Sequence, residues 1–228
     1  MFSSAEELVN YISENDVKFV DVRFCDLPGV VQHFNLPAAS YGIEEITEGL
    51  LFDGSSITGF QGIHESDMKL LADVTSAYID PFREAKTLVV THSIVDPFTD
   101  EPYSRDPRQV AAKAEAYLES TGIADTVFFG AEAEFYLFDS IRYENTPGSS
   151  FYKIGSQEAA WDMGTDEPGG NQGYKTPFKG GYFPVSPQDQ YADIRDQMSL
   201  TLEQIGFEME RAHHEVGSAG QQETNYKF

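Results

Sequence analysis

The feature that most restricts the fold is the stretch GAEAEFYLFD, residues 130–139, which places Glu132 and Glu134 one residue apart in a run typical of a β-strand. Side chains alternate between the two faces of a strand, so both acids share a face with Tyr136 and Phe138. The remaining residues on both faces are apolar, which predicts a buried strand. At about 7 Å and an effective dielectric near 20, the two carboxylates repel by roughly 2 kcal/mol. We therefore expect a cation on this face.

The overall charge excludes several classes of partner. The 228 residues include 38 acids and 15 basic residues, a formal net charge of −23, which argues against nucleic acid and anionic membranes. No apolar run is long enough to cross a bilayer, and the first residues lack a signal-peptide pattern. The one cysteine, Cys25, cannot form an internal disulfide. These features predict a soluble, cytoplasmic protein.

A proline-containing segment, DPFTDEPYSRDPR at residues 96–108, separates two regions of different pattern. Its three prolines and turn-forming acids have no helical or strand period, as expected for a linker. We therefore predict two domains, residues 1–104 and 105–228.

The first region predicts a short helix followed by strands. Ser4 and Glu7 fit a capping box at the start of the helix. Residues 17–36 alternate as two strands around a turn, and residues 87–95 alternate as a further strand. The pattern lacks a strand–helix–strand repeat, so we predict an α+β fold class.

The second region predicts a helix that ends at Gly122, then the strand with the two acids. A second helix is predicted over residues 188–206, and two strands over 207–216 and 221–228. Between them, residues 140–177 are rich in Gly, Ser, Asn and Pro, and we predict no helix or strand there.

The two C-terminal strands supply a second pair of acids. If Ser218 to Gly220 form a three-residue loop with Gly220 at positive φ, the register places Glu215 opposite Glu223. Like charges directly across a strand pair are destabilising, so this pair also calls for a cation. The alternative is that both acids lie on a solvated face and never meet. A second acid pair in the same region weakens that alternative.

Carboxylate oxygens in groups of two or three are the ligands expected for Mg²⁺ or Mn²⁺. Zinc is disfavoured because there is no cysteine cluster, and because His213 and His214 are adjacent and point to opposite faces of a strand. At most one of them could join Glu215. Each is otherwise a hydrogen-bonded packing residue, and we keep both as neighbours of the site.

Two glycine-rich segments are candidates for contact with a ligand. In FDGSSITGFQGIHESD, residues 52–67, Asp53 and Asp67 could accept a proton or bind a cation. In KGGYFPVSP, residues 179–187, two glycines allow close approach of the backbone and Tyr182 offers a phenol. Taken alone, each segment could equally be an ordinary turn or loop.

Taken together and in order, these segments resemble the N-terminal half of a bacterial type I glutamine synthetase, over essentially the whole chain. The segments are VDVRFCDLPGVVQHF, FDGSSITGFQGIHESD, PYSRDPR, GAEAEFYLFD, KGGYFPVSPQD and HHEVGSAGQQE. The resemblance implies a small β-grasp-like N-terminal domain, followed by the first part of a catalytic domain with a curved antiparallel sheet. It also implies ligation of ammonia to L-glutamate through γ-glutamyl phosphate, with ATP as substrate and two ions of Mg²⁺ or Mn²⁺.

The resemblance further implies roles for single residues. It assigns one metal to Glu134, Glu215 and Glu223, and the second metal, on the ATP phosphates, to Glu132. Ammonium binding and deprotonation are assigned to Asp53, with Ser56, Tyr182 and Glu215 around it, and Asp67 is a further catalytic candidate. The candidate nucleotide-binding residues are Glu210, Tyr226, Lys227 and Phe228.

Members of the family that the chain resembles assemble as rings, usually a dodecamer of two hexamers, in which Asp53 would act on the neighbouring subunit's site. Their chains are about twice this long, so we expect a partial chain that is inactive alone. Three alternatives stay open: a related ligase that joins glutamate to a larger amine, a metal-dependent phosphohydrolase and a non-catalytic acidic binding module. The group of Asp53, Ser56 and Tyr182 favours ammonia, and the four glutamates argue against a dead site.

Overall fold

The computed structural model describes residues 2–162 and 173–227. Chain contacts divide it into two compact units, Met1–Val127 and Phe128–Phe228. The boundary predicted between residues 104 and 105 stays a prediction. The division by contacts falls later in the chain and places α3 (Pro107–Thr121) in the first unit. Within the described ranges, no helix is both long enough and apolar enough to span a membrane.

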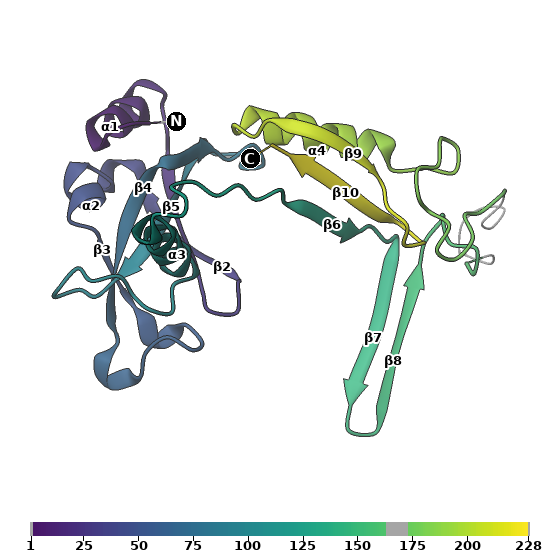
Figure 1. Cartoon of the computed structure of the whole chain (residues 1–228), viewed down its shortest axis with the longest axis horizontal. Coiled ribbons are helices and arrows are strands. Elements are labelled where there is room, and N and C mark those ends of the chain that lie inside the picture. Colours follow the sequence, from purple (N-terminus) through teal and green to yellow (C-terminus); the bar gives the residue numbers. More distant parts are fainter. Residues whose placement is uncertain (1, 163–172, 228) are drawn as a thin grey trace. The chain divides into compact units, whose positions relative to one another are not determined.

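The first unit is a mixed five-stranded sheet with two helices packed on one face (Figure 1). Its elements before α3 are α1 (Ala5–Glu14), β1 (Phe19–Cys25), β2 (Val31–Pro37), α2 (Ile43–Thr47), β3 (Leu50–Asp53), β4 (Asp67–Ile79) and β5 (Thr87–Val95), with short 3₁₀ turns at Ala38–Ser40, Gly54–Ser56 and Ile63–Glu65. The strand order is β2-β1-β5-β4-β3. Only β1 and β5 are parallel, and the other neighbours are antiparallel. The predicted N-terminal helix, first hairpin and strand at residues 87–95 are confirmed.

The apolar face of this sheet forms the core of the first unit. Alternation points Val20 and Val22 of β1 inward, where they pack with Leu88 of β5 and with Leu8 and Ile12 of α1. All five side chains are buried. Burying each such side chain contributes on the order of 2 kcal/mol, so this face holds the helices on the sheet.

A buried histidine in this core predicts acid sensitivity. His92 on β5 is fully buried, its Nδ1 lies 3.0 Å from the Val90 carbonyl, and its Nε2 lies 3.1 Å from the hydroxyl of Tyr41. Burial lowers the pKa of His92 from 6.5 to about 4. The unfolded chain therefore binds an extra proton between these values, so stability is complete above pH 6.5 and falls as the pH drops towards 4.

We expect a loss of about 3 kcal/mol in unfolding free energy across this window from His92 alone. Urea unfolding of wild type and His92→Gln at pH 7, 5.5 and 4 measures it, with the exposed His64→Gln as a matched control. The His92 variant should show a flatter pH dependence and the His64 variant the wild-type slope. Equal slopes in wild type and His92→Gln would refute this explanation.

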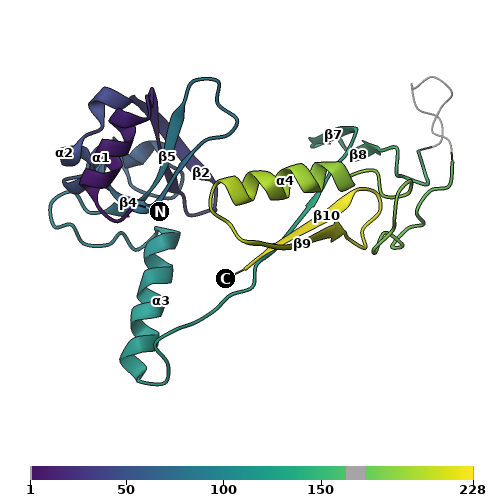
Figure 2. The ribbon, with the colours of Figure 1, turned by 90° about the horizontal axis from the view of Figure 1, so that it is seen from above.

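The second unit contains an antiparallel sheet, a helix packed against it and a separate hairpin. Its elements are β6 (Glu132–Tyr136), β7 (Ser140–Thr146), β8 (Ser149–Gly155), α4 (Ala192–Gln204), β9 (Met209–His214) and β10 (Gln221–Tyr226). The sheet has the order β6-β10-β9, and β7 pairs only with β8. Helix α4 runs beside β9 and β10 (Figure 2). The α+β prediction is confirmed, as are the helix and the three strands predicted for the residues of this unit.

The strand predicted to be buried is instead the edge of the described sheet. β6 pairs with β10 alone, and Glu132, Glu134 and Tyr136 are exposed. Apolar and aromatic residues indicated a strand correctly, because they fit a pleated surface. They do not determine how many neighbours cover it, and for that reason the prediction of burial was wrong.

The sequence patterns also missed four strands. β7 and β8 form a hairpin in the stretch for which no element was predicted, with Tyr143 directly across from Tyr152. Serine and asparagine hide the alternation there, although Pro147-Gly148 is a turn signal. β3 and β4 flank the glycine-rich loop, and their pairing brings Asp53 directly opposite Asp67.

Candidate metal centre

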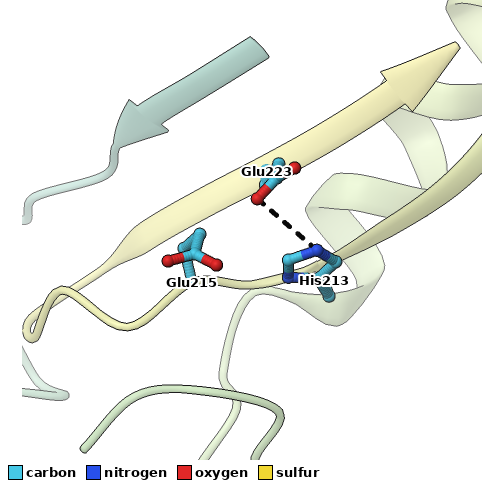
Figure 3. A group of neighbouring side chains, drawn as sticks. All are labelled: His213, Glu215 and Glu223. Carbon is cyan, nitrogen blue, oxygen red and sulfur yellow. Dashed lines mark ion pairs between the residues drawn. The ribbon is translucent and has the colours of Figure 1, made fainter. Parts of the chain in front are cut away.

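One face of the β6-β10-β9 sheet carries most of the predicted metal ligands. Glu223 on β10 lies directly opposite Glu134 on β6 and His213 on β9. Glu215 follows His213 by two positions, so it shares this face and lies diagonal to Glu223. Potential ligand atoms of His213, Glu215 and Glu223 all lie within 4.8 Å of one another. Figure 3 shows these three side chains close together, with His213 on β9, Glu223 on β10 and Glu215 just after β9.

The predicted register of the last hairpin was wrong by two residues. Glu215 pairs with Gln221 (backbone N to O, 2.9 Å), and Glu223 faces His213 instead of Glu215. The connecting loop is longer than predicted, and within it the Gln221 side chain accepts a hydrogen bond from the amide of Gly217 at 2.7 Å. Gly220 does have the expected positive φ, 83°. A shift of two preserves the strand face, so the two acids still meet, but diagonally.

Hydrogen bonds from the chain orient the three carboxylates. One oxygen of each accepts a bond: Glu215 from the Val216 amide (2.7 Å), Glu134 from the Gln221 side chain (2.8 Å) and Glu223 from the Asn225 side chain (2.8 Å). The second oxygen of Glu223 lies 3.5 Å from Nε2 of His213. Each carboxylate is thus fixed through one oxygen, which leaves the other for a cation.

The electrostatics of this face favour a bound cation. Glu215 and Glu223 are only 8% and 6% exposed, and two carboxylates about 5 Å apart repel by roughly 3 kcal/mol at an effective dielectric near 20. The buried Oδ1 of Asn225, beside Glu223, has no hydrogen-bond partner among the described residues. The converging group of two carboxylates and one imidazole, with the Glu134 carboxylate on the residue directly across from Glu223, is rich in hard oxygen ligands, so the residues present fit Mg²⁺ or Mn²⁺.

Glu132, the predicted ligand of a second metal, lies two cross-strand pairs further along, at the next position on the same face. It is exposed on β6, directly opposite Asn225, and is not part of the three-residue group. Strand alternation therefore places Glu132 and Glu134 on one face, as predicted, with Asn225 beside the first and Glu223 beside the second.

A glycine allows the loop with Tyr182 to approach this group. The amide of Gly181 lies 3.2 Å from the Val216 carbonyl, and a Cβ at Gly181 would lie 2.6 Å from the Glu215 carbonyl oxygen. The rings of Tyr182 and Phe183 lie edge-on to His213 with centroids 5.7 and 4.8 Å away. The structure thus brings Tyr182 to His213, a member of the three-residue group.

A buried polar network lies on the opposite face of β9 and β10, and sequence reasoning missed it. Nε2 of His214 lies 2.7 Å from the Glu158 carboxylate, and both side chains are almost fully buried. Burial alone would lower the pKa of His214, but the hydrogen bond and charge of Glu158 outweigh it and raise the pKa. Arg195 on α4 binds Asp189 through two nitrogens, at 3.0 and 2.5 Å.

In the first unit, the structure brings Asp53, Ser56 and Asp67 together. Asp53 accepts bonds from the Ser55 amide and hydroxyl at 2.9 and 2.6 Å and from the Ser56 hydroxyl at 3.1 Å. The bonds from Ser55 are the main cause that lowers the pKa of Asp53, so this exposed carboxyl is ionised at neutral pH. The middle of the loop between β3 and β4 is also held in place, because Arg105 donates a hydrogen bond to the Gly59 carbonyl at 2.7 Å.

The predicted nucleotide-binding residues lie at the end of the terminal hairpin. The Tyr226 ring packs edge-on to Phe207 at 5.1 Å, and Lys227 pairs with Glu208. That bond, with the charges of Glu208 and Glu210, raises the pKa of Lys227. Phe228 lies outside the described residues. Their role in binding a nucleotide stays a prediction.

Comparison of the chain with known proteins identifies the family to which it is similar. Residues 16–97 match the family model of the glutamine synthetase β-grasp domain, and residues 104–228 match that of the glutamine synthetase catalytic domain. The glutamine synthetase of Streptomyces filamentosus is 58% identical over 228 residues, all of this chain and 48% of that protein. The Mycobacterium tuberculosis (strain CDC 1551 / Oshkosh) enzyme is 55% identical over 226 residues, 98% of this chain and 47% of that protein.

Solved structures agree with these matches. The Plasmodium falciparum glutamine synthetase superposes with a TM-score of 0.88 at 26% identity, covering 99% of this chain and 44% of that one. A structure of GmaS without ligand has a TM-score of 0.66 at 16% identity, covering 96% of this chain and 44% of that one, and shows the fold alone. The chain belongs to the glutamine synthetase family, and the β-grasp prediction is confirmed. It spans about half the length of the curated relatives it matches.

Proposed function

We propose that the intact protein is a glutamate–ammonia ligase, which forms glutamine, ADP and phosphate from L-glutamate, ammonia and ATP through γ-glutamyl phosphate. Membership of the family supports the reaction class. The observation that carries the proposal is the convergence of Glu215, Glu223 and His213, with Glu134 opposite, on one face of the family's catalytic domain. Repulsion between these carboxylates would destabilise an ordinary protein surface. At a site that binds cations together with several anionic substrates, the same carboxylates would serve as metal ligands.

The residues divide the chemistry between them. Glu134, Glu215 and Glu223 would hold one divalent cation and Glu132 a second. Cations bound there would offset the negative charge of the ATP and glutamate oxygens, which phosphoryl transfer to a carboxylate requires. Tyr182, packed against His213, lines the same face. The ionised carboxyl of Asp53 is suited to bind ammonium and accept its proton, with the Ser56 hydroxyl beside it.

The direct test is ATP-dependent product formation by the intact protein in the presence of Mg²⁺ or Mn²⁺. Ammonium and a series of larger amines should be compared at equal concentration, with ATP hydrolysis measured in parallel. We expect glutamine as the main product and little ATP turnover without glutamate. Preference for a larger amine would assign a related ligase, and ATP hydrolysis without ligation a phosphohydrolase.

Asp53→Asn is expected to lower kcat/KM for ammonium by about 100-fold, because general base catalysis and charge attraction are both lost. The KM values for glutamate and ATP should change little. Steady-state kinetics with varied ammonium measures this, and Asp16→Asn, which alters an exposed acid of the same unit, serves as the matched control. An Asp53 variant with wild-type ammonium kinetics would remove this residue from the proposed mechanism.

We also propose that the intact protein assembles as a ring of identical subunits, a dodecamer of two hexamers, in the cytoplasm. Family membership supports an oligomer. The exposed aromatic side chains Tyr143 and Tyr152 on the β7–β8 hairpin are consistent with a surface that is covered in an assembly. Analytical ultracentrifugation gives the subunit number, and cell fractionation gives the location.

A further inference from the structure

Four charged side chains are buried on the face of β9 and β10 that is opposite the metal ligands. Glu158, Asp189, Arg195 and His214 are all less than 9% exposed. They come from three parts of the chain: the segment after β8, helix α4 with the loop before it, and β9. Such a concentration of charge inside a small unit is unusual and calls for an explanation.

The contacts join these residues into one network. Glu158 accepts from the backbone amide of Gln190 at 3.0 Å through one oxygen and lies 2.7 Å from His214 Nε2 through the other. Asp189 accepts two bonds from Arg195, which also donates to the side chain of Gln222 on β10. Because Gln222 lies directly opposite His214, the two ion pairs hold adjacent strands at the same pair of residues.

His214 extends the network to the metal face. Its Nδ1 lies 2.8 Å from the backbone carbonyl oxygen of Glu215, while its Nε2 lies beside Glu158. Both ring nitrogens therefore have a polar partner, and the ring is held between Glu158 and the Glu215 peptide. The carboxylate of Glu158 thus sets the ring plane of His214, and the ring holds the peptide group that carries the Glu215 side chain.

Stability alone does not explain this network. Well-packed apolar residues commonly stabilise a core as much as a buried ion pair or more, because desolvation offsets the attraction between the charges. What the network does provide is fixed geometry beneath a site, as the hydrogen-bond partners of metal ligands do in metalloproteins. It does so where β9 ends and the backbone continues into the loop at Val216.

We infer that Glu158 is a positioning residue for the metal centre, which acts through His214 to fix the Glu215 carboxylate at the distance from Glu223 that a divalent cation requires. The inference rests on the proposed function, since it presumes a cation at Glu215. Glu158 touches neither substrate nor metal in this account. Its effect reaches the site through the backbone of β9.

The test is Mn²⁺ binding to the intact protein, followed by electron paramagnetic resonance. Glu158→Gln keeps the size of the side chain and an acceptor for Gln190 but removes the charge beside His214. We expect Mn²⁺ affinity to fall about 10- to 100-fold, and the spectrum of the bound ion to broaden at saturating Mn²⁺. Glu158→Asp, which retains the carboxylate, should restore part of the affinity. The matched control is Glu203→Gln, the same change at an exposed site on α4, and it should bind as wild type does.

The outcomes separate this inference from the proposed function. If Glu215→Gln loses Mn²⁺ binding while Glu158→Gln keeps wild-type affinity and spectrum, the metal centre stands and the role of Glu158 is wrong. If wild type binds no Mn²⁺, the proposed function fails first. Thermal unfolding of each variant distinguishes a folding defect. If Glu158→Gln unfolds, the folded Glu158→Asp variant decides, because its shorter side chain should still weaken the contact with His214 and lower Mn²⁺ affinity. Wild-type affinity and a wild-type spectrum in that variant would overturn the inference.

Discussion

Glu223→Gln is expected to weaken Mn²⁺ binding by about 100-fold or more and, in the metal-free protein, to increase stability. Glu223 is 6% exposed and lies between Glu134, His213 and Glu215. Removing its charge takes away a ligand, which amounts to roughly 3 kcal/mol of attraction for a cation. The same change relieves repulsion from the neighbouring acids, which we expect to stabilise the metal-free fold by up to about 1 kcal/mol.

Opposite signs for stability and binding are the signature of a site built for a cation. Calorimetric titration with Mn²⁺ and urea unfolding in a chelator measure the two effects. Glu144→Gln, the same substitution on the exposed hairpin strand β7, should change neither. If Glu223→Gln binds Mn²⁺ with wild-type affinity, or destabilises the metal-free protein, the carboxylate has a structural role instead.

Gly181→Ala is expected to reduce the ligase activity of the intact protein by about 100-fold. A Cβ at this position would lie 2.6 Å from the Glu215 carbonyl oxygen and 2.9 Å from Cε1 of His214, so the loop must move. That movement separates Tyr182 from His213, and a displacement of about 1 Å at a reacting group can reduce a rate by two orders of magnitude. Overpacking should also lower stability by about 1–3 kcal/mol.

Gly130→Ala is the matched control for this substitution. Gly130 lies two residues before Glu132, and a Cβ there meets nothing within 4 Å. Its stability should stay within about 0.5 kcal/mol of wild type, with activity unchanged. Steady-state kinetics and thermal unfolding of both variants, at saturating metal, give the comparison. Wild-type activity in Gly181→Ala would show that close packing of this loop is not required.

Alternation along strands made much of this site predictable. Glu132 and Glu134 share a face because they are two residues apart, and the same parity relates His213 to Glu215. The error of two residues in the register of the last hairpin did not change the face assignment, because such a shift keeps each side chain on the same face of the sheet. The same parity placed His213 beside Glu215, although the sequence alone could not decide between a ligand and a packing residue.

What the sequence could not show depends on contacts between distant segments. Glu158 lies in SQEAAW, a stretch without period, and only folding brings it to His214, 56 residues away. Burial of β6 was overestimated because its apolar residues do not reveal that β10 is its one partner in the described sheet. The pairing of Asp53 with Asp67 likewise depends on β3 and β4, whose mixed composition has no clear alternation.

The most direct test of the central claim is a crystal structure of the intact protein with Mn²⁺, in which anomalous scattering locates the ions independently of the protein atoms. The account predicts one peak within about 2.5 Å of oxygens from Glu134, Glu215 and Glu223, and a second beside Glu132. Saturating Mn²⁺ with no anomalous peak on this face would contradict it.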